Sequence, residues 1–200
     1  MNKVIVLVLC WLTAGCNEQI PVPKLSEEAV ILAFGDSLTY GTGASKNNDY
    51  PSILSEMTSM TVVNSGIPGE VSSKGLKRLP ALLDQHQPEL LILVHGGNDL
   101  LRKVSSRHTE SNLGEMIAEA RKRDISVIML GVPKPGLLFL ESDDIYTNVA
   151  NEHQVPIDLE VLPDVLGNNG LKSDTIHPND NGYQIIAERV FELMQDTGAI

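Results

Sequence analysis

The sequence predicts an α/β fold, a three-layer α/β/α sandwich around a mostly parallel sheet of about five strands. Two features predict it: short apolar runs rich in Val, Ile and Leu, and longer amphipathic stretches between them. Apolar runs of this length are typical of strands buried on both faces of a parallel sheet. Strands and helices that alternate along a chain pack in layers, with helices on both faces of the sheet.

The individual elements follow from these two patterns. The apolar runs are residues 30–34, 61–63, 90–94 and 126–130. The amphipathic stretches are residues 50–59, 72–85, 112–123, 145–152 and 180–194. In the last stretch apolar side chains recur every three or four residues, which is typical of a helix with one buried face. Ligands of such sheets gather at the carboxyl ends of the strands, so the segments just after the runs are candidates for a site.

Composition excludes several classes of protein. A chain of 200 residues that is 42% hydrophobic is long and apolar enough for one domain with a full core, and is not a disordered protein. Aromatic residues make up 4%, which argues against stacking on single-stranded nucleic acid. The net charge of −11 repels phosphate backbones, so we expect no nucleic-acid partner.

The start of the chain resembles a bacterial lipoprotein signal peptide. Lys3 precedes an apolar run over residues 4–12, which is shorter than the roughly 20 residues that span a bilayer but suits a signal peptide. The run leads to Leu-Thr-Ala-Gly-Cys, which resembles a lipobox except at Thr13. This resemblance implies cleavage before Cys16 and lipidation of Cys16. An ordinary secretory signal, with Cys16 incidental, is the alternative.

We therefore expect three segments: a signal peptide over residues 1–15, a tether over 16–28 and the folded domain over 29–200. Asn17, rather than Asp, follows the cysteine, which by resemblance favours the outer membrane. The expected location is the bacterial cell envelope, with the protein lipid-anchored and facing the periplasm, or otherwise soluble in the periplasm. Both cysteines lie within the first sixteen residues, which excludes a disulfide framework, a thiolate zinc site and a cysteine nucleophile in the domain.

Four polar segments carry the candidate chemistry. They are Gly-Asp-Ser-Leu-Thr at 35–39, Asn-Ser-Gly-Ile-Pro-Gly-Glu at 64–70, His-Gly-Gly-Asn-Asp at 95–99 and Asp-Thr-Ile-His-Pro at 174–178. The first three follow strands and the fourth precedes the last helix, so the sheet brings all four to one edge. Asp174 is three residues before His177, so a tight turn lets its carboxylate reach Nδ1 and leaves Nε2 to accept the proton of Ser37.

These segments resemble the GDSL, or SGNH, family of serine hydrolases. The resemblance rests on Gly-Asp-Ser-Leu at 35–38, Gly69, Gly-Gly-Asn-Asp at 96–99 and Asp-x-x-His at 174–177, in the family's order. Residues 62–102 look much like the bacterial thioesterase I/lysophospholipase L1/arylesterase branch. The resemblance implies the SGNH hydrolase fold, which is flavodoxin-like.

The resemblance also implies a role for each matching residue. Ser37 matches the nucleophile, His177 the general base and Asp174 the residue that orients the base. The oxyanion hole uses the backbone N–H of Ser37, the backbone N–H of Gly69 and the side-chain amide of Asn98. Gly66 is the alternative to Gly69.

Other polar residues near the site have simpler explanations. Asp36 and Asp99 are expected to make loop hydrogen bonds rather than join the triad. His95, at a strand end, is expected at the rim or in packing. No pair of histidines has metal-ligand spacing, and the implied reaction requires no cofactor, so we expect neither a metal nor a cofactor.

The resemblance implies hydrolysis of carboxylic esters: arylesters, lysophospholipids or acyl thioesters. The partners expected are an ester or lipid substrate and, through the lipidated N-terminus, a membrane. Two alternatives are a carbohydrate O-acetylesterase of the same family and a non-catalytic lipoprotein scaffold. The apolar residues 137–140 follow the fourth strand, where they form a pocket wall, touch a membrane or are simply buried.

Overall fold

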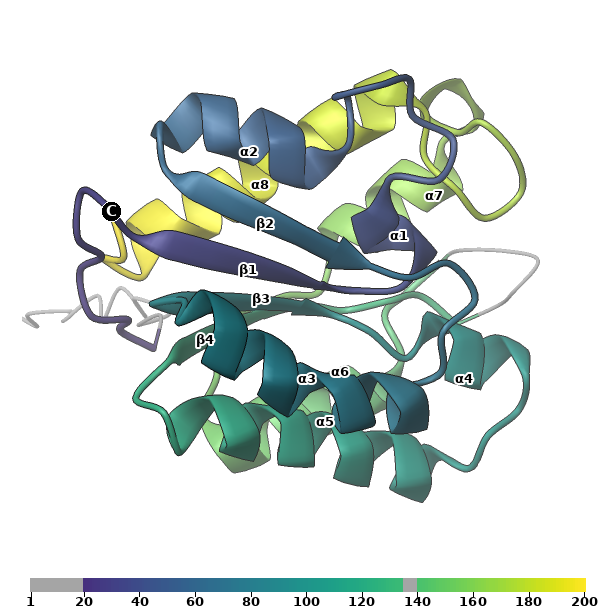
Figure 1. Ribbon diagram of the computed structural model, residues 1–200. Helices are drawn as coiled ribbons and strands as arrows, with labels where there is room; N and C mark the ends of the chain where they lie inside the picture. Colours follow the sequence, from purple (N-terminus) through teal and green to yellow (C-terminus); the bar gives the residue numbers. More distant parts are fainter. Residues whose placement is uncertain (1–19, 135–139) are drawn as a thin grey trace, which may run out of the picture.

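A computed structural model describes residues 20–134 and 140–200, and it has the predicted α/β architecture. Five parallel strands form one sheet in the order β2-β1-β3-β4-β5 (Figure 1). The strands are β1 (Val30–Gly35), β2 (Thr61–Gly66), β3 (Leu90–Val94), β4 (Ser126–Leu130) and β5 (Ile157–Asp158). The predicted fold class is confirmed.

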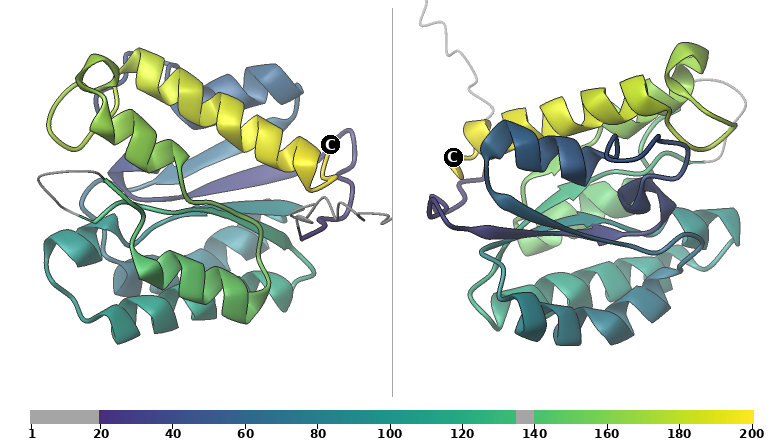
Figure 2. Two further views of the ribbon diagram at one scale, coloured as in Figure 1. Left: turned by 180° about the vertical axis from the view of Figure 1, so that it is seen from behind. Right: turned by 45° about the horizontal axis from the view of Figure 1, so that its top comes forward.

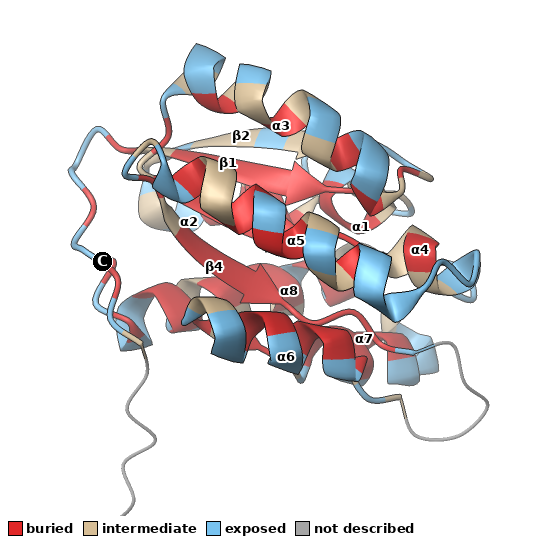
Figure 3. Cartoon of the chain, turned by 90° about the horizontal axis from the view of Figure 1, so that it is seen from below, coloured by how far each residue is buried: buried red, intermediate tan, exposed pale blue. Residues whose placement is uncertain are grey.

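Helices cover both faces of the sheet. The structure contains α1 (Ser37–Tyr40), α2 (Tyr50–Thr58), α3 (Ser72–His86), α4 (Gly97–Leu101), α5 (Ser106–Arg121), α6 (Asp144–His153), α7 (Val161–Gly167), a 3₁₀ turn (Asn169–Leu171) and α8 (Asp180–Asp196). In Figure 1, α2, α7 and α8 lie on one side of the sheet and α3, α5 and α6 on the other. Seen from below, α3, α5 and α6 each carry both buried and exposed residues, as expected of helices with one packed face (Figure 3).

Strand β2 differs from the prediction that every strand is buried on both faces. It is longer than predicted, ending at Gly66, and all six of its residues are partly or fully exposed. Its place at the edge of the sheet explains this, because an edge strand has a neighbour on one side only. Strands β1 and β3, in contrast, lie inside the sheet and form the centre of the core.

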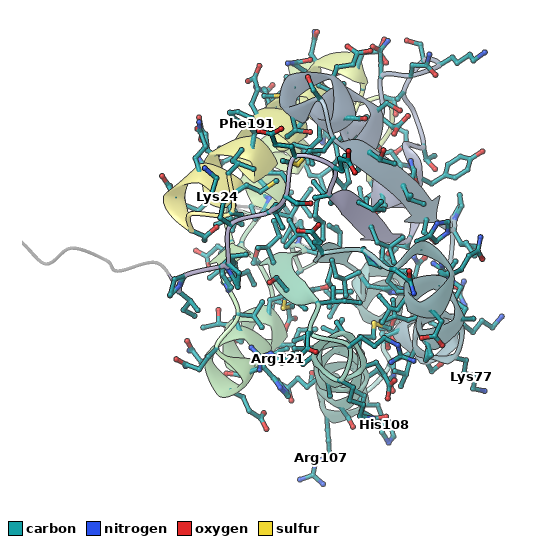
Figure 4. All side chains as sticks on the ribbon, turned by 60° about the vertical axis from the view of Figure 1, so that its left-hand side comes forward. Lys24, Lys77, Arg107, His108, Arg121 and Phe191 are labelled. Carbon is teal, nitrogen blue, oxygen red and sulfur yellow. The ribbon has the colours of Figure 1, made fainter. Side chains whose placement is uncertain are left out.

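The segment before β1 also differs from the prediction, because the described part of the predicted tether packs on the domain. The backbone N–H of Val22 donates to the carbonyl of Thr197 at 2.9 Å, and that of Leu25 donates to Ala199 at 2.8 Å. Val22 and Leu25 are both buried in the core. Figure 4 looks at this end of the domain and labels Lys24 in the N-terminal segment and Phe191 on α8. The folded body therefore includes residues from about Val22 onward.

Helix α8 connects the two ends of the domain. It begins at the loops beyond the carboxyl ends of the strands and ends beside the N-terminal segment (Figure 2). Among residues 20–134 and 140–200, no helix is both long and apolar enough to cross a membrane.

Candidate active site

Ser37 lies at the carboxyl edge of the sheet because β1 ends one residue before Asp36 and α1 starts at Ser37. Asp36 caps α1: its Oδ1 accepts the backbone N–H of Leu38 at 3.1 Å. Gly35 allows the end of β1 to lie close to the end of β3, since a Cβ there would lie 2.1 Å from the carbonyl oxygen of Val94. Ser37 is thus the first residue of a short helix at the end of the strand.

Ser37, His177 and Asp174 form one chain of hydrogen bonds. Nε2 of His177 lies 3.0 Å from Oγ of Ser37, and Nδ1 lies 2.7 Å from Oδ2 of Asp174. A carboxylate only accepts, so the Nδ1 beside it carries the ring proton in the neutral imidazole. Nε2 is then the acceptor that faces the hydroxyl of Ser37.

The turn at residues 174–177 holds the carboxylate in place. Oδ1 of Asp174 accepts the backbone N–H groups of Ile176 at 2.8 Å and His177 at 2.9 Å. The hydrogen bond with His177, together with that from the Ile176 N–H, lowers the pKa of Asp174 below its ordinary value. The side chain of Asp174 is 53% exposed and that of His177 is 14% exposed, so solvent reaches the carboxylate far more than the ring.

Asn98 approaches the same point from α4. Its Nδ2 donates to Oδ2 of Asp36 at 3.0 Å, so a buried carboxylate fixes the orientation of the amide. Burial raises the pKa of Asp36, although His95 and the hydrogen bonds from Leu38 and Asn98 oppose this. An amide nitrogen has two hydrogens, and the second has no acceptor within residues 20–134 and 140–200, so it is available to a group in the cleft that Asn98 lines.

The structure favours Gly69 over Gly66 as a donor. The N–H of Gly66 already donates to Oδ1 of Asn64 at 3.0 Å. The N–H of Gly69 has no acceptor among the described residues, and Gly69 lines the same cleft as Ser37 and Asn98. Gly69 has φ = 76°, a conformation that suits glycine, and its carbonyl accepts Arg102 at 2.9 Å.

These residues open into a cleft of about 1010 Å³. Apolar side chains from three short helices and from loops line much of it: Leu38, Leu101, Val132, Leu140, Leu166 and Ile176. Of the predicted segment 137–140, Leu140 lines the cleft, while residues 137–139 lie outside the described part of the chain. Cys16 likewise lies outside it.

Asp99 and His95 are separate from the Ser37 chain. The carboxylate of Asp99 accepts the backbone N–H of Ser72 at 2.7 Å and the hydroxyl of Ser72 at 2.6 Å, as a loop hydrogen-bonding role requires. His95 is buried in packing rather than placed at the rim. In the described ranges, no three His, Cys, Asp or Glu side chains gather as a metal site would require.

Sequence reasoning missed one set of polar residues beside the site. Glu70, Arg78 and His95 are joined by hydrogen bonds under the loops that carry Gly69 and Asn98. The only signal was an arginine on a predicted helix eight residues after a loop glutamate, which does not by itself predict a contact.

Comparison with known proteins identifies the family. Residues 33–185 match the model of the GDSL-like lipase/acylhydrolase family. The chain belongs to this family. The predicted family and the predicted class of enzyme, a GDSL-type serine hydrolase that acts on carboxylic esters, are thereby confirmed.

Two curated relatives and one solved structure illustrate the similarity. The chain is 32% identical over 172 residues to thioesterase 1/protease 1/lysophospholipase L1 of Escherichia coli strain K12, covering 82% of this chain and 83% of that protein. It is 32% identical over 170 residues to an arylesterase of Vibrio mimicus, covering 80% and 85%. The crystal structure of TesA superposes with a TM-score of 0.75 at 27% identity, covering 84% of this chain and 99% of that one.

Proposed function

We propose that this hydrolase cleaves esters or thioesters of medium or long acyl groups, with Ser37 as nucleophile, His177 as general base and Asp174 as the residue that orients the base. The observation that carries the proposal is the hydrogen-bonded chain from Ser37 through His177 to Asp174 at the mouth of the cleft. Gly69 and Asn98 line the cleft beside it.

The reaction proceeds in two steps. Oγ of Ser37 bonds to the acyl carbon while its proton moves to Nε2 of His177. The bond to the leaving alcohol or thiol breaks, and His177 returns the proton to that leaving group. Water then attacks the acyl-enzyme, gives a proton to His177 and releases the acid together with a reprotonated Ser37.

The oxyanion formed in each step needs donors placed in advance. The backbone N–H groups of Ser37 and Gly69 and the Nδ2 of Asn98 are assigned this role. Each such donor is worth about 10² to 10³ in rate. Asp36 leaves one hydrogen of Asn98 free and fixes its direction, which is what this role requires.

The cleft supports an acyl substrate larger than acetate. Its volume of about 1010 Å³ and its apolar lining exceed what an acetyl group fills. The names of its relatives include a thioesterase/lysophospholipase and an arylesterase. Lysophospholipids and fatty-acyl thioesters offer long acyl groups, and arylesters offer an apolar leaving group. A carbohydrate O-acetylesterase would make no use of this apolar surface. A non-catalytic scaffold would not require the intact chain of Ser37, His177 and Asp174.

The cellular location is also a proposal. We infer from the lipobox-like residues before Cys16 that the mature chain is lipidated at Cys16 and attached to the outer membrane, facing the periplasm. Several acyl chains, at about 0.8 kcal/mol per buried CH₂, give firm attachment. Acyl-CoA is absent outside the inner membrane, so lipids or small esters are the favoured substrates there.

The function is tested with Ser37→Ala and a chain-length series of p-nitrophenyl esters beside lysophospholipid. We expect Ser37→Ala to lose hydrolysis and labelling by a fluorophosphonate, while its urea unfolding curve stays that of the wild type. Ser111→Ala is the matched control, because Ser111 is an exposed serine on α5 whose hydroxyl donates to Glu115. Turnover above a few per cent in Ser37→Ala contradicts the nucleophile, and activity confined to acetyl esters favours the O-acetylesterase.

A further inference from the structure

One buried polar network lies beneath all three strand ends that carry the proposed oxyanion-hole donors. Its members are Glu70, which follows Gly69, Arg78 of α3 and His95, which follows β3. Glu70 and His95 are buried, and Arg78 is largely covered, with 21% of its side chain exposed. None of the three lines the cleft, so none is placed to touch a substrate.

Arg78 ties together the ends of β1 and β2 and the loop that follows. Its guanidinium donates through Nε to both carboxylate oxygens of Glu70, at 3.0 and 2.8 Å. It also donates to the carbonyls of Gly35, at 3.2 Å, and Ser65, at 2.9 Å. The guanidinium lies 4.1 Å above the ring of Phe34. Gly35 is two residues from Ser37, so the same side chain reaches the strand that positions the nucleophile.

His95 connects this cluster to the segment that carries Asn98. Nδ1 of His95 accepts the backbone N–H of Gly96 at 2.9 Å. With Nδ1 an acceptor, the ring proton is on Nε2, which lies 3.2 Å from Oε2 of Glu70 and donates to it. The carbonyl of His95 accepts the hydroxyl of Tyr146 at 2.9 Å. The ring is thus fixed at both nitrogens, and it bridges Glu70 and the start of α4.

The packing leaves the ring little freedom. Gly75 of α3 lies so close that a Cβ there would be 2.4 Å from Nε2 of His95. Gly96 has φ = 102°, so the chain turns sharply just before Asn98. Burial raises the pKa of Glu70, but the hydrogen bonds from His95 and Arg78 outweigh it and hold that pKa below its usual range. Glu70 is therefore an anion that accepts from α3, through Arg78, and from the segment after β3, through His95.

We propose that Glu70, Arg78 and His95 are positioning residues that hold Gly69, Asn98 and the backbone of Ser37 at the spacing the oxyanion requires. The inference rests on the proposed function, since it concerns the oxyanion hole of that reaction. The link between Glu70 and His95 is the decisive one, because it joins the Gly69 loop to the Asn98 segment and to no other part of the site.

Substitutions that cut this link separately from its neighbours test the proposal. In His95→Asn, Oδ1 still accepts the N–H of Gly96, but the donor to Glu70 is lost. In His95→Gln, the amide still reaches Glu70, but the acceptor for Gly96 is lost. Glu70→Gln places an amide donor against the donors of Arg78 and His95. Each variant is compared with the wild type for kcat, KM and free energy of unfolding.

We expect kcat for a p-nitrophenyl ester to fall about 10- to 100-fold in Glu70→Gln and His95→Asn, with KM changed less than about threefold, since displaced donors affect the transition state most. Phosphonylation of Ser37 by an organophosphonate, whose adduct also places an oxygen in the hole, slows in parallel. The Glu70→Gln/His95→Asn double variant loses about as much kcat as the more strongly affected single variant, because both substitutions break the same hydrogen bond. Arg78→Lys, which keeps the charge, replaces Glu70→Gln if that variant does not fold.

Two different results separate the failure of this proposal from the failure of the function. If Ser37→Ala is inactive and the folded Glu70→Gln and His95→Asn variants keep wild-type kcat and phosphonylation rates, the positioning role is overturned and the function stands. Losses that follow the free energy of unfolding, or that add in the double variant, also overturn it. Full activity in Ser37→Ala overturns both.

Discussion

At the scale of single residues, Asp36 has two hydrogen-bonding roles, and the sequence alone does not distinguish them. One carboxylate oxygen caps α1 through Leu38, and the other accepts the amide of Asn98 from a segment 62 residues away. Capping alone would be satisfied by Ser or Asn as well. Only a group that accepts on both oxygens also orients the amide of Asn98, so the second role explains why a buried carboxylate occupies this position.

This second role predicts the effect of Asp36→Asn. The new side chain still caps α1 with its oxygen, but its nitrogen faces the nitrogen of Asn98. We expect the Asn98 amide to turn over, which places an oxygen where the hole needs a donor. The predicted result is a fall in kcat of about 10² with the free energy of unfolding within about 1 kcal/mol of the wild type. Steady-state kinetics and urea unfolding measure the two quantities.

Asn98→Ala is the reference for this experiment, because it removes the donor outright. If Asp36→Asn keeps wild-type kcat while Asn98→Ala loses activity, the carboxylate does no more than cap the helix. If both variants change KM and leave kcat alone, Asn98 binds the substrate instead of the oxyanion.

The proposed catalytic residues were the easiest to predict. Asp174 and His177 are three residues apart, and such a spacing places them together in almost any tight turn. Ser37 and Asn98 follow strands, so the parallel sheet brings them to one edge. The polar network beside the site was not predictable. Glu70 and His95 are 25 residues apart, and no periodic pattern in the sequence indicates that their side chains pack together. Burial of His95 depends on α3, whose Gly75 lies against its ring.

At the scale of elements, long periodic segments were predicted and short ones were not. Helices α1 and α4 have four and five residues, too few to show a helical period, yet they carry Ser37 and Asn98. Helix α5 begins at Ser106, six residues before the predicted start. The signal for this start was present in the sequence, because Ser105 is a good N-cap, and its hydroxyl accepts the N–H of His108. The exposure of β2 depends on strand order, which apolar runs do not specify.

The N-terminal segment is the element whose role the structure changes most. Val22 and Leu25 are buried, and Oε2 of Glu89 accepts the backbone N–H of Ser26 at 2.9 Å. A buried Val or Leu side chain is worth about 1.5–3 kcal/mol, part of which offsets the entropy of ordering the segment. Residues 22–28 are thus expected to stabilise the domain rather than only connect it to an anchor.

Two truncated chains test this expectation. A chain that starts at residue 20 should unfold in urea as the longer chain does. A chain that starts at residue 29 should lose about 2 kcal/mol or more, because the surface under Val22 and Leu25 becomes exposed. Its KM for small esters should not change, since the cleft is at the other end of the domain. Equal stability of the two chains would mean that the segment is a tether over its whole length.

At the scale of the whole molecule, the cleft and the N-terminal segment lie at opposite ends. Helix α8 begins three residues after His177 and ends beside Val22. Its 17 residues span about 25 Å at 1.5 Å per residue. Cys16 is six residues before Val22, a stretch that reaches at most about 20 Å. Under the proposed lipidation, the membrane attachment therefore starts from the end of the domain that is remote from Ser37.

This separation means that anchoring and catalysis are lost independently. In a Gram-negative host, we expect the wild type in the membrane fraction and labelled by radioactive palmitate. We expect Cys16→Ser to be unlabelled and either released or left as uncut precursor.

Cys10→Ser is the matched control, because Cys10 lies in the segment that cleavage would remove, so its label and fractionation should be those of the wild type. The released or truncated protein should hydrolyse p-nitrophenyl esters with wild-type kcat, because the cleft is at the end of α8 opposite to Val22. Palmitate uptake by Cys16→Ser, or a soluble and unlabelled wild type, would contradict lipidation at Cys16 and leave an ordinary signal peptide. A loss of activity on release would instead show that the attached end acts on the cleft across the length of α8.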